Sequence, residues 1–289
     1  MSDFTRIGVV GGGTMGAGFA ELCIVNGLDV VVAAPTADSV ARSQRRLFGS
    51  LARQVEKGKL SAQARDLALT RLRFTTDLGD LADRQFVLES VPENEQKKLD
   101  VFAALDKVVE SPEAILASNT SSIPIARLGR ATARADRVIG IHFFNPVQVL
   151  PLVELIGSLR TDEKAYLAAE AFVGGTLGKQ VIRSPDRPGF VVNALLIPYL
   201  LSAVRMLESG VATAADIDTA MTRGCAHPMG PLALVDLIGL DTVAAVADAL
   251  YIETKEHSYA VPPLLARMVD SGFLGKKSGR GFYSYDKRP

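Results

Sequence analysis

Short hydrophobic runs alternate with amphipathic segments through the first part of the chain. Ile7–Val10 ends in glycines and is followed by apolar residues at helical spacing, Met15, Phe19 and Cys23, and then by a second β-rich run, Val30–Val32. Later strand-like runs, again separated by helical sequence, are Phe86–Leu88, Ala114–Leu116 and Val138–His142. This alternation predicts an α/β fold with a parallel, doubly wound sheet.

The pattern changes at two places. Ser43–Lys57 and Ser61–Leu72 have the pattern of two helices joined at Gly58, with Arg and Lys at their polar positions. Beyond Val181 the strand signals stop at the Pro- and Gly-bearing sequence SPDRPG, which is typical of a linker. The helical segments that follow are Asn193–Gly210, Thr213–Thr222, Leu234–Tyr251 and Pro263–Ser271. The sequence therefore predicts two domains, residues 1–186 and 187–289, and the second is all helical.

Composition and charge exclude several classes of protein. Hydrophobic residues make up 48% of the chain, and 32 basic residues balance 32 acidic ones, so no net field draws the protein to nucleic acid or to an anionic membrane. There is no signal segment and no apolar run of about 20 residues, which favours a cytoplasmic protein. Cys23 and Cys225 stand alone, so neither a disulfide framework nor a metal site is expected.

The first strand leads into a glycine-rich turn, Gly11-Gly12-Gly13-Thr14-Met15-Gly16. Its spacing fits G-x-G-x-x-G, and the strand before it and the helix after it supply the context that this motif needs. Gly11 is expected to form the tight turn, Gly13 to let the backbone approach a pyrophosphate, and Gly16 to pack the helix against the strand. The turn predicts a dinucleotide site.

The end of the second strand bears on the choice of cofactor. A carboxylate there normally accepts hydrogen bonds from the adenine ribose of NAD, but this chain has Ala34. Alanine removes those bonds and also the repulsion against a 2′-phosphate, so NADP is permitted. It is not selected, because the nearest basic residues, Arg42 and Arg45, lie on the following helix, and Asp38 is an alternative partner for the ribose. We expect NAD as the cofactor.

Two titratable residues suggest proton transfer. Of the three histidines, only His142 ends a predicted sheet strand, where doubly wound sheets bind ligands. Oxidising an alcohol by hydride transfer needs a base for the hydroxyl proton, and histidine has the unperturbed pKa nearest neutrality. Glu154 lies in the apolar run Leu152–Ile156, where a carboxylate is costly unless it is paired. We expect Glu154 to pair with His142, the alternative being an exposed glutamate on an edge strand.

Two polar side chains are candidates for binding the substrate oxygens. Ser121 follows the predicted strand that ends near Ser118, and Asn193 begins the first helix of the second domain. Donors placed where negative charge develops lower a reaction barrier. Both residues are equally suited to capping a helix, and this alternative stays open from the residues alone.

Several separated stretches resemble one family. They are GGGTMGAG, ESVPENEQKK, SNTSSIPI, IHFFNPV, LVELI, PGFVVNALL, HPMGPLALVDLIGLD and GKKSGRGFYSY. In this order and spacing the chain resembles the L-3-hydroxyacyl-CoA dehydrogenases nearly end to end, especially the single-function 3-hydroxybutyryl-CoA type. The resemblance implies a Rossmann-like domain with an inserted helical pair, a helical C-terminal domain that forms a homodimer, and interconversion of L-3-hydroxyacyl-CoA and 3-ketoacyl-CoA.

The resemblance also implies residue roles. It makes His142 and Glu154 the catalytic pair, with Ser121 at the 3-oxygen and Asn193 near the thioester. The implied cofactor-binding residues are Gly11, Gly13, Thr14, Met15, Gly16, Ala34, Glu93, Lys98 and Asn145. The implied substrate-binding residues are Ser50, Lys57, Ser121, Asn145 and Asn193, with Arg53 and Lys59 as further candidates for the CoA phosphates. Lys98, Arg53 and Lys59 are equally consistent with ordinary charged helix surfaces.

Two alternative functions remain open at this point. An enzyme of the same fold could act on a free or carrier-bound 3-hydroxy acid. A non-catalytic homologue with a structural or cofactor-sensing role would tolerate Ala34, but it would not need the intact set of His142, Glu154, Ser121 and Asn193. The segment around His227 is expected to be architectural, and Asp236 is expected to cap or pair within the helical domain. The closing GKKSGRGFYSY is expected to pack across the subunit boundary and to serve folding.

Overall fold

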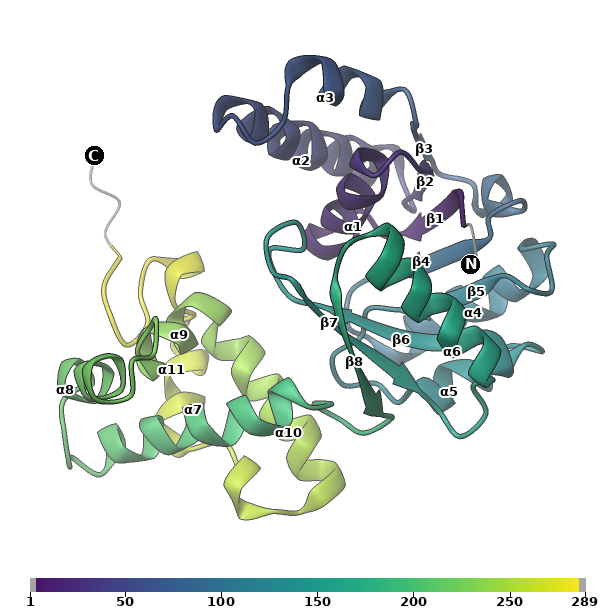
Figure 1. The fold of residues 1–289 in the computed structure, drawn as a ribbon. Coiled ribbons are helices and arrows are strands. Elements are labelled where there is room, and N and C mark those ends of the chain that lie inside the picture. Colours follow the sequence, from purple (N-terminus) through teal and green to yellow (C-terminus); the bar gives the residue numbers. More distant parts are fainter. Residues whose placement is uncertain (1–3, 286–289) are drawn as a thin grey trace. The chain divides into compact units, whose positions relative to one another are not determined.

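The computed structural model describes residues 4–285, which form two compact units that divide between Arg187 and Pro188. The division lies one residue from the boundary expected from the sequence. The first unit is built on an eight-stranded sheet in the order β3-β2-β1-β4-β5-β6-β7-β8 (Figure 1). Its strands are β1 (Arg6–Val10), β2 (Asp29–Ala33), β3 (Leu72–Thr75), β4 (Phe86–Glu89), β5 (Ile115–Ser118), β6 (Val138–Phe143), β7 (Leu152–Gly157) and β8 (Gln180–Pro185).

Helices cover both faces of this sheet (Figure 1). They are α1 (Thr14–Val25), α2 (Ala37–Glu56), α3 (Ala62–Leu69), α4 (Glu95–Val108), α5 (Ile125–Gly129) and α6 (Glu163–Glu170). On the face toward α1 and α6, Phe19 and Phe86 belong to one buried core with Phe172, and the rings of Phe86 and Phe172 lie 4.8 Å apart. Burying side chains of this size supplies most of the driving force for folding. The doubly wound α/β prediction is confirmed.

One strand departs from the parallel arrangement. β7 runs antiparallel to β6, and the two strands pair His142 with Glu154 in register. The residues between them form only a short loop, whereas a parallel connection needs a crossover of a dozen or more residues. The sheet is thus parallel, as predicted, except at β7, and this reversal brings two site residues side by side.

Two helix boundaries also differ from the expected ones. α2 starts at Ala37, six residues before the predicted Ser43, because Thr36 and Ser39 form a reciprocal capping box. The second helix of the inserted pair ends at Leu69 instead of Leu72, and the chain continues as β3. The periodic pattern missed β3 because a strand of four residues leaves too short an alternation to distinguish from a helix end.

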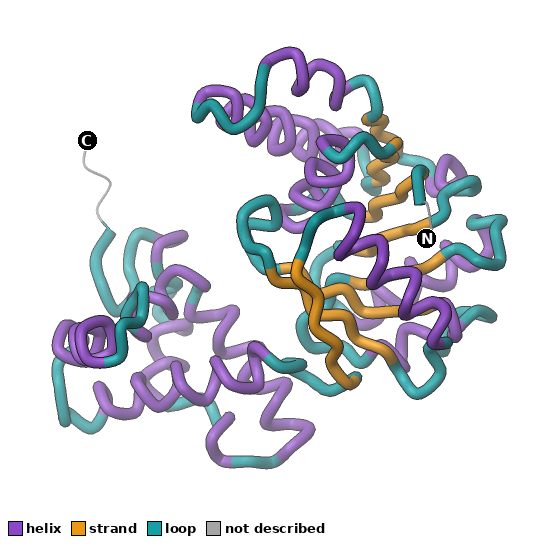
Figure 2. Tube along the Cα trace, viewed as in Figure 1, coloured by secondary structure: helices purple, strands orange, loops and turns teal. Residues whose placement is uncertain are grey.

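The second unit is helical, as predicted (Figure 2). Its helices are α7 (Val192–Glu208), α8 (Ala214–Thr219), α9 (Pro231–Ile238), α10 (Leu240–Thr254) and α11 (Pro263–Asp270). The single helix expected over Leu234–Tyr251 is broken at Gly239, whose φ of +105° no other residue adopts readily. None of the helices within residues 4–285 is long and apolar enough to cross a membrane.

Two aspartates, the buried Asp236 and the partly buried Asp218, bind the end of the chain to this unit. Asp236 accepts hydrogen bonds from the N–H groups of Phe282 and Tyr283, each at 2.9 Å, and from the Tyr285 hydroxyl at 3.0 Å. Asp218 accepts the Tyr283 hydroxyl at 2.8 Å and two N–H groups in the first turn of α9. The closing segment therefore packs within its own unit, and Asp236 pairs there as expected.

Candidate active site

The glycine-rich turn at the end of β1 has the geometry of a phosphate cradle. Gly11 adopts φ +98°, and a Cβ there would lie 2.6 Å from the carbonyl oxygen of Ser90. A Cβ on Gly16 would lie 1.9 Å from the carbonyl oxygen of Gly11, so only glycine allows α1 this close to the strand. At Gly13 nothing lies within 4 Å, and no side chain caps the N-terminus of α1. The open N-terminus fits the pyrophosphate of a dinucleotide.

Arg46 is a residue at this turn that the sequence did not reveal. It extends from α2, and its Nη1 donates to the carbonyl oxygen of Gly12 at 3.2 Å. The close approach of α2 depends on Gly12, because a Cβ there would lie 2.0 Å from Oγ of Ser43. Arg46 thus places a cation beside the phosphate cradle. The sequence shows only several arginines on one helix and gives no signal that this one faces the turn.

Ala34 directly follows β2 and leaves the end of this strand without a carboxylate. Its N–H donates to the carbonyl oxygen of Thr75, and the residue is buried. Asp38 lies exposed in the first turn of α2. The surroundings of Ala34 therefore contain neither the carboxylate that excludes a 2′-phosphate nor a basic side chain directly after the strand that would select one.

His142 lies between a buried carboxylate and a hydroxyl. Its Nδ1 is 2.7 Å from Oε2 of Glu154, and its Nε2 is 3.0 Å from Oγ of Ser121. Glu154 is fully buried, which excludes the exposed-edge alternative. Because an ionised carboxylate only accepts hydrogen bonds, Nδ1 carries the hydrogen and Nε2 of the neutral ring is the basic nitrogen. The carboxylate fixes this tautomer and the orientation of the ring.

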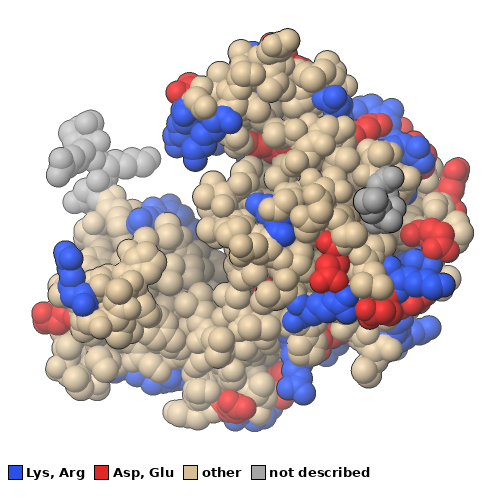
Figure 3. Space-filling view, in the orientation of Figure 1, with Lys and Arg blue, Asp and Glu red and all other residues tan. Residues whose placement is uncertain are grey.

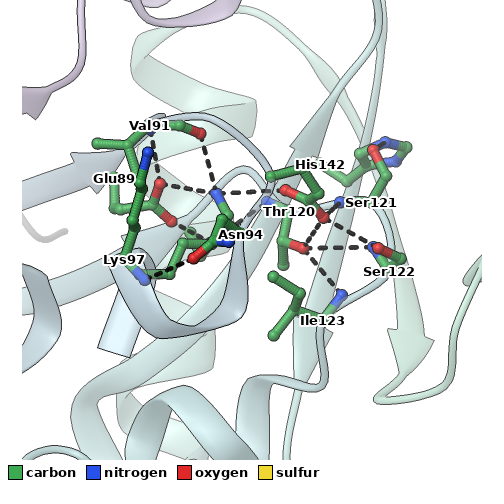
Figure 4. Close-up of polar contacts among 12 residues, drawn as sticks. Glu89, Val91, Asn94, Lys97, Thr120, Ser121, Ser122, Ile123 and His142 are labelled. Atoms are coloured by element: carbon green, nitrogen blue, oxygen red, sulfur yellow. Dashed lines mark hydrogen bonds and ion pairs between the residues drawn. The ribbon is translucent and has the colours of Figure 1, made fainter. Parts of the chain in front are cut away.

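Ser121 lies between Thr120 and Ser122 on the turn between β5 and α5 (Figure 4), and Glu93 binds all three residues. The Glu93 carboxylate accepts the Thr120 hydroxyl at 2.5 Å, the Ser122 hydroxyl at 3.0 Å and the Ser121 N–H at 3.2 Å. Ser121 does not cap a helix, because α5 begins at Ile125 and Asp186 accepts its first N–H groups. The hydroxyl of Ser121 is thereby directed at the imidazole.

Lys98 is buried behind this turn, although the sequence left it open as a solvated helix residue. Its Nζ lies 2.7 Å from Oε1 of Glu89, 3.3 Å from Oε2 of Glu93 and 3.3 Å from the carbonyl oxygen of Val91. Partial burial raises the pKa of Glu93, but the Lys98 charge and the hydrogen bonds from Thr120 and Ser122 outweigh it, and the net pKa is lowered. Glu93 is therefore ionised at neutral pH and accepts all of these bonds.

Asn145 lies exposed in the loop that joins β6 to β7, directly before a cis proline. A buried ammonium fixes this loop, since Nζ of Lys179 donates to the carbonyl oxygens of Val147 and Leu150 at 2.6 and 2.9 Å. Gln148 adds a bond of 2.5 Å to Glu21 on α1. The loop that carries Asn145 is thus anchored on both sides.

Comparison with known proteins identifies the family. The family model described as "3-hydroxyacyl-CoA dehydrogenase, NAD binding domain" matches residues 6–187, and the corresponding C-terminal domain model matches residues 189–285. The chain belongs to the 3-hydroxyacyl-CoA dehydrogenase family.

Individual members of this family are similar over their full lengths. A 3-hydroxybutyryl-CoA dehydrogenase of Mycobacterium tuberculosis is 56% identical over 286 residues, covering 99% of this chain and 100% of the relative. The human mitochondrial hydroxyacyl-coenzyme A dehydrogenase is 39% identical, over 97% of this chain and 91% of the relative. The crystal structure of (S)-3-hydroxybutyryl-CoA dehydrogenase from Ralstonia eutropha superposes with a TM-score of 0.94 at 43% identity, covering 99% and 100% of the two chains.

The remaining expected residues of this 3-hydroxyacyl-CoA dehydrogenase lie at the end of α2. Arg53 occupies its last turn, Lys57 is its C-cap, and Lys59 follows in the turn to α3, all three exposed. Figure 3 shows basic side chains gathered at this end of the helical pair, at the upper left. Ser50, one turn earlier, is partly buried, and its side chain counteracts the rise that burial causes in the pKa of Glu21. Arg53, Lys57 and Lys59 therefore form a local positive charge that suits an anionic group of a ligand.

Asn193 belongs to the second unit and lies in the first turn of α7. It is not the N-cap, because that position is Val191 and no side chain caps this helix. The capping alternative is therefore excluded. Nδ1 of His227 is 3.1 Å from the Tyr199 hydroxyl within the same unit. Among residues 4–285 no group of three or more His, Cys, Asp or Glu side chains is arranged to hold a metal ion.

Proposed function

We propose that this protein is an oxidoreductase that interconverts L-3-hydroxyacyl-CoA and 3-ketoacyl-CoA with a nicotinamide cofactor, with 3-hydroxybutyryl-CoA as the substrate. The observation that carries the proposal is His142 held between Glu154 and Ser121. The family membership and the names of the full-length relatives support it.

The residues divide the oxidation between them. Nε2 of His142 removes the proton of the 3-hydroxyl, and the Glu154 carboxylate stabilises the imidazolium that results. When substrate is bound, the Ser121 hydroxyl, which lies 3.0 Å from Nε2 in the structure, donates to the 3-oxygen instead and holds this oxygen within reach of the ring. A nicotinamide cofactor held at the glycine-rich turn would supply the acceptor for the hydride of C3. In the reverse direction His142 returns the proton to the oxygen of the ketone.

The residues proposed to bind the substrate and the cofactor are assigned from the chemistry of their side chains and backbone. Ser50 and Lys57, with Arg53 and Lys59, are proposed to bind the CoA phosphates, and Asn193 is proposed to bind near the thioester. Glycines 11, 13 and 16 with Thr14 and Met15 are proposed to bind the pyrophosphate, and Asn145, Glu93 and Lys98 to serve the nicotinamide side. NAD is the proposed cofactor, although Ala34 permits NADP.

A homodimer through the second unit is also proposed. The described surface of this unit has large exposed apolar side chains, with Leu195 at 73%, Ile252 at 67% and Leu237 at 50% exposure. Exposed apolar side chains mark an interface where they form a contiguous patch. Sedimentation velocity at micromolar protein tests the proposal, and a single monomeric species would refute it. A cytoplasmic location and a part in fatty-acid β-oxidation remain predictions.

The decisive experiment is the initial rate with acetoacetyl-CoA, using NADH and NADPH in parallel, each titrated to saturation. Rapid oxidation of either cofactor supports the proposed function, and the ratio of the two efficiencies identifies the cofactor. Free acetoacetate serves as the matched substrate without CoA. Activity with acetoacetate alone would support the free-acid alternative, and no oxidation by folded protein would support the non-catalytic one.

A further inference from the structure

A buried carboxylate on α1 lies between two parts of the first unit that the proposed function assigns to the substrate. Glu21 is 1% exposed, and its two oxygens accept hydrogen bonds from Gln54 of α2 and from Gln148 in the loop that joins β6 to β7. We propose, on the basis of the proposed function, that Glu21 is a positioning residue that couples the binding of the CoA phosphates at α2 to the placement of Asn145 in this loop. Glu21 itself touches neither the substrate nor the cofactor in this role.

Each oxygen of the Glu21 carboxylate serves one side of this connection. Oε1 accepts a hydrogen bond from Nε2 of Gln54, and Oε2 accepts one of 2.5 Å from Nε2 of Gln148. An ionised carboxylate accepts at both oxygens in this way. The two glutamines are far apart in the sequence and belong to different elements, so Glu21 joins α2 to the loop through side chains alone.

The loop is closely fitted to α1. A Cβ on Gly18, three residues before Glu21 and on the same face of the helix, would lie 3.0 Å from Cβ of Val147. Two backbone hydrogen bonds of 3.0 Å close the loop into a compact turn that contains Gln148. Asn145 directly precedes this turn. A shift of Gln148 relative to α1 therefore moves Asn145 as well.

The other side of the connection carries the residues proposed to bind the CoA phosphates. Gln54 lies in the last turn of α2, one turn after Ser50, next to Arg53 and three residues before the C-cap Lys57. Burial raises the pKa of Glu21, and the Ser50 side chain and the Arg53 charge counteract this rise. Both side chains therefore act on the same carboxylate, and a bound phosphate that attracts them changes its surroundings.

Stability does not account for a carboxylate at this position. Burial raises the pKa of Glu21 despite its hydrogen bonds, so the ionised form is less favourable in the folded protein than in water. The carboxylate instead supplies two directed bonds. Binding energy from a part of the substrate remote from the reacting atoms can orient the reacting centre, and a substrate without that part then loses kcat. Glu21 carries this effect from the CoA phosphates to Asn145.

A comparison of two substrates tests the inference. Acetoacetyl-pantetheine is the same thioester as acetoacetyl-CoA but lacks the nucleotide and its phosphates. The measured quantity is the ratio of kcat for acetoacetyl-CoA to kcat for acetoacetyl-pantetheine, at saturating NADH. We expect a ratio of about fivefold or more in the wild type, at the lower end of couplings between sites. In Glu21→Met the ratio should fall to near one, because only kcat for acetoacetyl-CoA decreases.

Two further variants serve as controls. In Glu21→Gln the amide oxygen accepts one bond and the amide N–H donates the other, so the ratio should stay within about twofold of the wild type. Gln63 is an exposed glutamine of α3, and Gln63→Met should leave both kcat values unchanged.

Three results would overturn the inference. One is an unchanged ratio in Glu21→Met, which would mean that Glu21 serves the fold alone, and another is a wild-type ratio near one. If Glu21→Met does not fold, Gln148→Met replaces it, because this substitution breaks the loop side of the same connection. A wild-type ratio in Gln148→Met is the third. Inactivity of the wild type with both thioesters would instead refute the proposed function itself.

Discussion

Both units of this protein bury carboxylates, but the partners of these carboxylates differ. In the sheet unit Glu154 faces the imidazole of His142, and Glu89 faces the ammonium of Lys98. In the helical unit Asp236 faces two backbone N–H groups and a tyrosine hydroxyl. All are acceptors with no access to water, so each must be satisfied within the protein.

This difference in partners separates carboxylates that act in the reaction from carboxylates that stabilise the fold. A backbone N–H never releases its proton, and burial, with a hydrogen bond to Asp236 as the next cause, raises the pKa of Tyr285 further above neutrality. The partners of Asp236 therefore keep one protonation state. Imidazole changes its state near pH 7, so the carboxylate beside it adjusts the energy of a proton transfer. We expect the first group of carboxylates to govern turnover and the second to govern unfolding.

The largest effect is expected from His142→Ala. Removal of the base should lower kcat about 100- to 10,000-fold, the range typical of general acid–base groups. NADH binding should be nearly unchanged, because the glycine-rich turn lies on other strands. Steady-state kinetics and fluorescence titration give the two quantities. Normal turnover in a folded variant would remove His142 from proton transfer.

Asp236→Ala should instead lower the free energy of unfolding and leave kcat unchanged. It leaves the N–H groups of Phe282 and Tyr283 and the Tyr285 hydroxyl without their acceptor, and we expect a loss of about 3 kcal/mol in the free energy of unfolding. The measurement is urea unfolding followed by circular dichroism. Asp248→Ala, an exposed aspartate of α10, is the control and should change it by less than about 0.5 kcal/mol.

The kcat of Asp236→Ala tests whether Asp236 serves the fold alone. Each folded molecule of Asp236→Ala should retain wild-type kcat under conditions where the variant is fully native. A large fall in kcat without loss of stability would mean that this carboxylate also serves the reaction.

Ala34→Asp introduces a third kind of carboxylate, whose hydrogen-bond partner would be the adenine ribose of the cofactor. A hydrogen bond to a charged group contributes about 1.5–3 kcal/mol, so NADH should bind about tenfold or more tightly relative to NADPH. Parallel fluorescence titrations of the variant and the wild type measure the ratio. An unchanged ratio would place the adenine ribose away from the end of β2.

The sequence predicted the parts of the site that depend on local pattern. The glycine spacing fixed the turn after β1, and the family motifs located His142, Glu154 and Ser121 on the right elements. The helical second domain and the alternation before it also followed from periodicity. These features are encoded over a few residues each, which is the range that such patterns cover.

What the sequence missed depends on tertiary contacts. Lysine is usually found at the surface of a protein. Lys98 is buried because the carboxylates of Glu89 on β4 and of Glu93 in the following turn pair with its ammonium. Arg46 reaches Gly12 across 34 residues of chain. The reversal of β7 follows from a connection too short for a crossover, and the break at Gly239 follows from a backbone angle that no hydropathy pattern records.

Glu21 lies between the two classes, and its substitution should have the smallest effect. Its carboxylate accepts bonds from the side-chain amides of Gln54 and Gln148, which are both neutral, and the Ser50 side chain and the Arg53 charge also lower its pKa. Burial, the largest cause, raises the pKa of Glu21 above 4.5 despite these bonds. The ionised form is therefore less favourable in the folded protein than in the unfolded chain.

This shift gives the stability a definite dependence on pH. Because the unfolded chain releases the Glu21 proton first, the free energy of unfolding falls as pH rises from about 4.5 through the folded pKa, and the cost is fully present at pH 7. Glu21→Gln removes the charge but keeps the shape, so the variant should unfold at higher urea than the wild type at pH 7. The difference should vanish near pH 4, where both side chains are neutral. If the free energy of unfolding rises equally at both pH values, the gain comes from packing, and Glu21 belongs with the carboxylates that only stabilise the fold. If it falls at pH 7, the hydrogen bonds of Glu21 outweigh the cost of its desolvation.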